Sequence, residues 1–152
     1  MLAPITAAML YDLVQCPHRV TMDMFADPAL KDRVSPFVQL LWERGSLYED
    51  EVIKGLSLPF VDLSHYAGDE KEQQTLDAMN RKEPLIYRAR IKTGDLLGDP
   101  DLLRFENSGY VAGDIKSGAG EEGGADDDER KPKIHYAVQL AVYTDILQQR
   151  TI

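Results

Sequence analysis

The stretch Leu85-Ile86-Tyr87-Arg88-Ala89-Arg90-Ile91 decides the fold class, because its alternating pattern predicts a strand that leads into two more. Residues 96–105 and 110–117 form these next two strand-like segments, and short turns separate all three. Asp99-Pro100 interrupts the second segment and predicts an irregularity near its centre. Together the segments predict a three-stranded antiparallel meander.

Helical patterns surround this meander. Four precede it and one follows it: residues 6–15, 19–25, 35–54, 69–81 and 134–149. Thr6, Ser35 and Asp69 can cap three of these helices, and Pro36 takes a favoured first-helical position. Helices, then a meander, then a helix predict an α+β fold.

The helix at 35–54 carries an apolar stripe that we expect to be buried. The stripe consists of Phe37, Leu40, Leu41, Leu47 and Val52. Trp42 is expected in the core as well, rather than as a platform on which nucleic-acid bases stack.

Composition predicts a soluble, cytoplasmic protein with a single domain. The chain has 152 residues, of which 43% are apolar and 28% charged. No apolar run approaches the ~20 residues of a membrane span, and the N-terminus lacks the pattern of a signal peptide. We expect one domain over 1–152, with a helical part at 1–82 and the sheet and last helix at 83–152.

The formal net charge of −9 argues against broad, non-specific binding to phosphates. The acids are unevenly placed, however, because six of them fall within 121–129 of a loop predicted at 118–131. Arg88, Arg90 and Lys92 share one predicted strand face and could contact phosphates, although a solvated face is an equal alternative. Charge alone therefore leaves nucleic-acid binding open.

Asp101, Asp114 and Lys116 form the strongest candidate site. A turn of three or four residues near 107–109 would bring Asp101 and Asp114 opposite or diagonal to each other. Along a strand Asp114 and Lys116 point the same way, and Ile115 points into the core. Burying such a cluster is costly unless the charges are paired or a cation joins them.

A divalent metal is the simplest explanation of this cluster. Two carboxylates, a backbone carbonyl and water suit Mg²⁺ or Mn²⁺. Lys116 could then activate a water molecule or stabilise charge on a phosphoryl oxygen. Gln139 and Tyr143, spaced i and i+4, share a face of the last helix. The alternative for the two aspartates and Lys116 is an ion-pair ladder across a hairpin. The alternative for Gln139 and Tyr143 is an ordinary amphipathic helix.

The ordered motifs resemble those of the RecB-like nucleases of the PD-(D/E)XK superfamily. They are Gly98-x-x-Asp101, Gly113-Asp114-Ile115-Lys116 and Gln139-x-x-x-Tyr143. Further stretches extend the resemblance over most of the chain, to a RecB-like family related to CRISPR-associated exonucleases. These stretches are Cys16-Pro17-His18-Arg19, Leu40-Leu41-Trp42-Glu43-Arg44-Gly45, Ile86-Tyr87-x-Ala89 and His135-Tyr136-x-x-Gln139-Leu140-x-x-Tyr143.

The resemblance implies a restriction-endonuclease-like core and hydrolysis of DNA phosphodiester bonds by a water that Mg²⁺ or Mn²⁺ activates. It makes Asp101 and Asp114 metal ligands together with the backbone carbonyl of Ile115, and Lys116 the catalytic lysine. Gln139 and Tyr143 would support the active site and the DNA. A single strand or a DNA end is one form the substrate could take.

Three features depart from the family pattern. Tyr48 stands where many relatives have a metal-binding histidine, and Glu49 or Glu51 could replace that ligand. Cys16 is the only cysteine, so this chain alone is not expected to hold an iron–sulfur cluster. The strand expected after the last helix is absent.

The missing strand leaves several alternatives open. The chain could be the N-terminal fragment of a longer protein, with a further C-terminal domain. It could form a homodimer that completes the sheet. It could also be a catalytically impaired module that binds nucleic acid or assembles with a partner.

Overall fold

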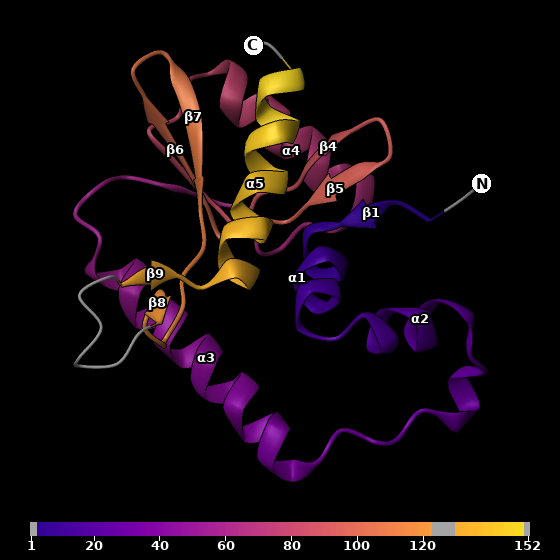
Figure 1. Ribbon diagram of the computed structural model, residues 1–152. Helices are drawn as coiled ribbons and strands as arrows, with labels where there is room; N and C mark the ends of the chain where they lie inside the picture. Colours follow the sequence, from indigo (N-terminus) through magenta and orange to yellow (C-terminus); the bar gives the residue numbers. More distant parts are fainter. Residues whose placement is uncertain (1–2, 123–129, 151–152) are drawn as a thin grey trace.

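Helices and short strands follow one another in an α+β order (Figure 1). This computed structural model describes residues 3–122 and 130–150. The helices are α1 (Ala7–Gln15), α2 (Pro17–Phe25), the 3-10 turn η1 (Pro28–Leu30), α3 (Pro36–Gly55), α4 (Gly68–Asn80) and α5 (Ile134–Gln149). The strands are β1 (Ile5–Thr6), β2 (Val61–Asp62), β3 (Leu85–Tyr87), β4 (Ile91–Thr93), β5 (Leu96–Gly98), β6 (Leu102–Glu106), β7 (Gly109–Gly113), β8 (Glu121–Glu122) and β9 (Lys131–Pro132).

The predicted meander is present, but its first two strands are each divided. β3 pairs with β6 in the order β2-β3-β6-β7, and β4 pairs with β5 in the order β1-β5-β4. The break at Asp99-Pro100 was predicted, whereas the break after β3 was not. There Arg88 adopts a left-handed backbone with φ +53°, which few non-glycine residues tolerate. Its N–H donates to the Asp101 carbonyl at 2.8 Å, so the two breaks lie side by side.

The β6–β7 hairpin is tighter than predicted. Glu106 pairs with Gly109, so Asn107 and Ser108 alone make the turn. Both have positive φ, at 47° and 71°, as a two-residue type I′ turn requires. The expected turn of three or four residues is therefore wrong.

Two of the three predicted helix caps are confirmed. Thr6 and Ser35 each accept a hydrogen bond from the backbone N–H three residues ahead, at 3.0 and 3.3 Å. Asp69 is not a cap, because α4 already begins at Gly68. In the predicted loop 118–131, β8 and β9 pair with each other, whereas the acids at 126–129 lie outside the described residues.

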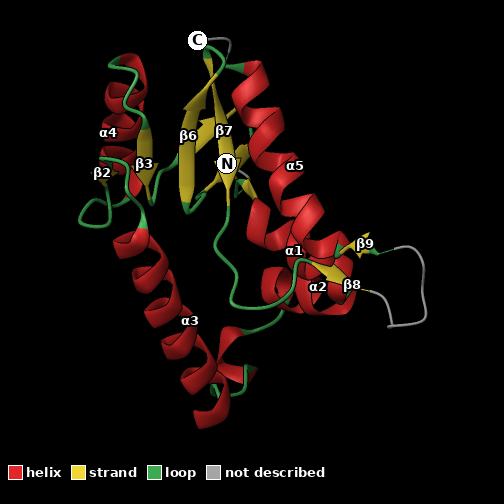
Figure 2. Cartoon of the chain, turned by 90° about the vertical axis from the view of Figure 1, so that its left-hand side faces the viewer, coloured by secondary structure: helices red, strands yellow, loops and turns green. Residues whose placement is uncertain are grey.

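Helix α3 extends away from the sheet, as Figure 2 shows, and leaves much of its apolar surface in water. Trp42 is 60% exposed, so the expectation that it belongs to the core is wrong. Four of the five residues of the predicted stripe are exposed as well, so the expectation that the stripe is buried is wrong for Phe37, Leu40, Leu41 and Leu47. The one buried residue of α3 is Ile53, which lies near the C-terminal end of the helix. Periodicity identified the apolar face but not whether the described chain covers it.

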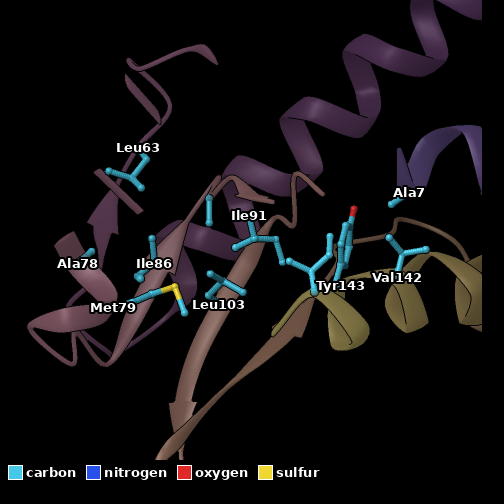
Figure 3. Close-up of a cluster of buried hydrophobic side chains, with 11 residues drawn as sticks. Ala7, Leu63, Ala78, Met79, Ile86, Ile91, Leu103, Val142 and Tyr143 are labelled. Atoms are coloured by element: carbon cyan, nitrogen blue, oxygen red, sulfur yellow. The ribbon is translucent and has the colours of Figure 1, made fainter. Parts of the chain in front are cut away.

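The core lies between α4, the meander and α5 (Figure 3). Its fully buried members include Ala78 from α4, Ile86 and Leu103 from the sheet, and Ile146 from α5. α1 packs along α5 and closes one side. No helix within the described ranges has the length and apolar character that crossing a bilayer requires.

Gly98 at the end of β5 lets the ring of Tyr143 pack directly on the strand. A Cβ atom at position 98 would lie 2.6 Å from Tyr143 Cδ1 and 2.8 Å from Cε1. Tyr143 is only 2% exposed, so its ring has little room to move. This glycine therefore fixes the distance between α5 and the segment that leads to Asp101.

Replacing Gly98 with alanine is expected to lower the free energy of unfolding by about 2 kcal/mol, because the added methyl group overpacks this contact. Urea unfolding measures the change. Gly45→Ala in α3 is the matched control, since a Cβ there meets nothing within 4 Å. That control should gain about 0.5–1 kcal/mol from helix propensity. Equal stability of Gly98→Ala and wild type would contradict the prediction.

Candidate functional site

Asp101 and Asp114 lie opposite each other at the ends of β6 and β7. The strand register pairs Leu102 with Gly113, and the next two positions are the aspartates. Asp101 Oδ2 accepts a hydrogen bond from the N–H of Ile115 at 2.7 Å, and the N–H of Asp101 makes a longer bond of 3.4 Å to Asp114 Oδ1. The predicted proximity of the two carboxylates is therefore present.

Lys116 lies on the same side as Asp114, as the alternation predicted. Its Nζ is 3.3 Å from Asp114 Oδ2, and its side chain is 33% exposed, against 7% for Asp114. β7 ends at Gly113, however, so these residues follow the strand instead of belonging to it. Ile115 is half-buried and lies outside the core cluster, so the expectation that it points into the core is wrong.

Asp114 Oδ2 is buried without a hydrogen bond from any described residue. Lys116 comes within ion-pair distance of this oxygen but does not make a hydrogen bond of acceptable geometry with it. A buried carboxylate oxygen without a donor costs free energy. Lys116 therefore places a positive charge near Asp114 Oδ2, but this oxygen still lacks a hydrogen-bond donor or a metal ion bound to it.

Asp101 is also unfavourably placed for a charged carboxylate. Burial is the largest cause, and it raises the pKa of Asp101 from 3.8 to about 6 although the Ile115 N–H bond opposes the change. The negative charges of Asp114 and Glu49 raise this pKa further, while the charge of Lys116 lowers it. A carboxylate that resists ionisation is a common property of metal and catalytic sites.

Without metal, the contribution of Asp101 to stability should fall as the pH rises from about 4 to about 6. Its pKa is higher in the folded than in the unfolded chain, so the folded state keeps the proton that the unfolded state has lost. Stability curves of wild type and Asp101→Asn across this range measure the effect. The difference between them should change by about 2 kcal/mol after allowance for solvent screening. Parallel curves would contradict the raised pKa.

Glu49 reaches the site from α3. Its Oε1 accepts hydrogen bonds from the Tyr87 hydroxyl at 2.7 Å and from Arg88 Nε at 3.0 Å. Glu51 is exposed, and Tyr48 is 41% exposed. Of the two acids that the sequence left open, Glu49 is therefore the one whose charge acts on Asp101.

Gln139 and Tyr143 share a face of α5, as their spacing predicted. Gln139 Nε2 donates to the Tyr143 hydroxyl at 3.1 Å, and that hydroxyl donates to the Asp99 carbonyl at 3.4 Å. Burial is the main cause that raises the pKa of Tyr143, so the hydroxyl stays protonated. The pair therefore ties α5 to the segment just before Asp101.

The arginines of the first predicted strand do not form a free basic face. Arg90 makes two hydrogen bonds to Asp99, at 2.7 and 2.9 Å, and Arg88 pairs with Glu49. Lys92 is exposed. Two of the three candidate phosphate contacts are thus already occupied by carboxylates, which sequence alternation could not reveal.

The acids of the site do not by themselves enclose a metal ion. Across residues 3–122 and 130–150, no three His, Cys, Asp or Glu side chains are grouped closely enough to do so. Asp101 and Asp114 offer two carboxylates, and Asp114 Oδ2 is a buried oxygen that accepts no hydrogen bond from the described residues. A hard divalent ion that keeps several water ligands fits such a set.

Comparison with known protein families, with characterised proteins and with solved structures finds no match to this chain. The chain is an α+β protein with a buried pair of aspartates, a neighbouring lysine and a glutamate held by an arginine.

Proposed function

We propose that this protein is a metal-dependent nuclease that hydrolyses phosphodiester bonds in DNA, and that it is a RecB-like member of the PD-(D/E)XK superfamily. The observation that most supports this proposal is the position of Asp114 Oδ2. This oxygen is buried without a hydrogen bond beside Asp101, and it lies 3.3 Å from Lys116 Nζ. The order of a helix, a meander and a helix packed on it supports a restriction-endonuclease-like core.

Asp101, Asp114 and the backbone carbonyl of Ile115 would hold Mg²⁺ or Mn²⁺, with Glu49 as a further carboxylate whose charge acts on Asp101. A bound divalent ion would supply an acidified water as nucleophile and would neutralise charge on the phosphate. Lys116, which is one-third exposed, is placed to donate a hydrogen bond to a phosphate oxygen.

Gln139 and Tyr143 act as positioning residues in this proposal. Gln139 donates to the Tyr143 hydroxyl, which in turn donates to the Asp99 carbonyl, and Gly98 lets the Tyr143 ring approach closely enough to do so. Asp101 follows two residues later, so its carboxylate is placed by α5 as well as by the sheet. We propose DNA, including single strands and ends, as the substrate.

The direct test is cleavage of labelled single-stranded and double-stranded DNA by the full chain. We expect products with Mg²⁺ or Mn²⁺ and none after chelation by EDTA. A calorimetric titration with Mn²⁺ on the same sample measures metal binding separately. Absence of both cleavage and metal binding would reject the nuclease.

The second candidate is a module that binds nucleic acid or assembles with a partner or a second copy. The apolar side chains of α3 support it, because exposed patches of this kind often mark contact surfaces. The pairing of Glu49 with Arg88 also supports it, since this carboxylate is already neutralised. Under this alternative Mn²⁺ produces no heat and no rise in melting temperature. Sedimentation would then show whether the chain forms dimers.

A further inference from the structure

Arg88 connects two parts of the candidate site that are far apart in the sequence. Its backbone N–H donates to the carbonyl of Asp101 at 2.8 Å, and its Nε donates to Glu49 Oε1 at 3.0 Å. The left-handed backbone at this residue, with φ +53°, is what allows both contacts at the break of the strand. Arginine in this conformation is unfavourable, and strain of this kind is often kept at functional sites.

The contact with Arg88 neutralises Glu49, a carboxylate whose negative charge otherwise acts on Asp101. Asp114 accepts a hydrogen bond from the Asp101 N–H and Asp101 accepts one from the Ile115 N–H, so the two carboxylates lie close together, and the charge of Glu49 acts on Asp101. Tyr87 donates to the same oxygen of Glu49 as Arg88 does. The Glu49 side chain is 15% exposed and that of Arg88 37%, so the guanidinium has access to water while the carboxylate is largely enclosed.

We propose that Arg88 is the resident counter-charge of Glu49 and that a divalent cation competes with it for this carboxylate. The inference rests on the proposed metal site. Glu49 exchanges the guanidinium for the cation, and the Arg88 side chain turns toward solvent. The backbone bond from Arg88 to Asp101 can remain in place during this exchange, because it does not involve the side chain.

Arg90 is a matched reference for every measurement on Arg88. It lies two residues away, carries the same charge, and its Nε also donates to a carboxylate, Asp99 Oδ1, at 2.7 Å. Asp99 is 47% exposed, and it is a different carboxylate from those of the candidate site. A general effect of ionic strength or net charge would change both arginines alike, whereas competition for Glu49 changes only Arg88.

The first test observes the arginine Nε–Hε resonances of the wild-type chain by NMR during a titration with Mg²⁺. We expect the Arg88 resonance to move toward the position of a solvent-exposed arginine as the site fills, because its hydrogen bond to Glu49 is lost. The Arg90 resonance should stay in place. Saturation of Mg²⁺ binding with an unmoved Arg88 resonance would overturn the inference.

The second test measures Mn²⁺ affinity by calorimetry. Arg88→Gln should bind Mn²⁺ about three- to tenfold more tightly than wild type, because Glu49 no longer has a competing partner. Arg90→Gln should change the affinity by less than about twofold, because the partner of Arg90 is an exposed carboxylate and exposed ion pairs contribute little. In a Glu49→Gln background, Arg88→Gln should lose its effect, since the two residues act as one unit.

The outcomes separate this inference from the proposed function. Wild type without Mn²⁺ binding would reject the metal site itself. Wild type that binds Mn²⁺, with equal effects of Arg88→Gln and Arg90→Gln or with weaker binding by Arg88→Gln, would overturn only the competition. If Arg88→Gln does not fold, the NMR titration of wild type decides alone.

Discussion

Lys116→Met is expected to reduce DNA cleavage by about 10²–10³-fold while leaving Mn²⁺ affinity equal or higher. The Lys116 ammonium lies 3.3 Å from Asp114 Oδ2, and its side chain is one-third exposed. In the proposed reaction its removal would deprive a developing phosphate charge of a donor, but it would also remove a positive charge that repels the metal. Cleavage rates at saturating Mn²⁺ and calorimetric titration measure the two effects separately.

Lys133→Met is the matched control for Lys116→Met. Lys116 and Lys133 both place their Nζ over the ring of Tyr136, at 5.9 and 5.6 Å. Each substitution therefore removes one positive charge and one contact with the same ring, but only Lys116 pairs with Asp114. Equal losses of cleavage in the two variants would indicate a general role in DNA affinity and would contradict a catalytic role of Lys116.

Asp114→Asn is expected to change activity and stability in opposite directions. Cleavage should fall by at least about 10²-fold, because the substitution removes a proposed metal ligand. The metal-free protein should gain about 1 kcal/mol in the free energy of unfolding, since a buried carboxylate with one oxygen, Oδ2, that accepts no hydrogen bond is replaced by a neutral amide. The charge of Asp114 also raises the pKa of Asp101, so the variant should bring that pKa closer to its usual value.

Asp99→Asn is the control for Asp114→Asn. Its carboxylate belongs to the same segment as Asp101 but is bound to Arg90, outside the aspartate pair. We expect it to keep most of the activity. Urea unfolding without metal and cleavage with Mn²⁺ are compared for both variants. A large loss of stability in Asp114→Asn would show that Asp114 serves mainly as the ion-pair partner of Lys116.

The order of the elements could be predicted because it depends on local patterns. Side-chain caps at Thr6 and Ser35 and the apolar period of residues 134–149 each act within a few residues, and the structure confirms the helices they define. The break after β3 could not be predicted. It arises from the left-handed backbone of Arg88, which no alternation of residue types indicates.

The exposure of α3 and the pairing of Glu49 with Arg88 could not be predicted from the sequence, for a different reason. An apolar stripe is equally compatible with burial and with exposure until the neighbours of the helix are known, and Trp42 is an example. Arg88 and Glu49 are 39 positions apart, and sequence spacing holds no information on such a contact. Asp101, Asp114 and Lys116 were found because adjacent strands of a hairpin have a register that a short turn limits.

Gly98 and Tyr143 have a consequence for how this chain can diverge. The ring fills the space that any side chain at position 98 would need. A lineage that gains a side chain at 98 therefore has to replace the tyrosine with something smaller, and it then loses the hydroxyl that holds the Asp99 carbonyl. We therefore expect related sequences to keep both residues or to lose both.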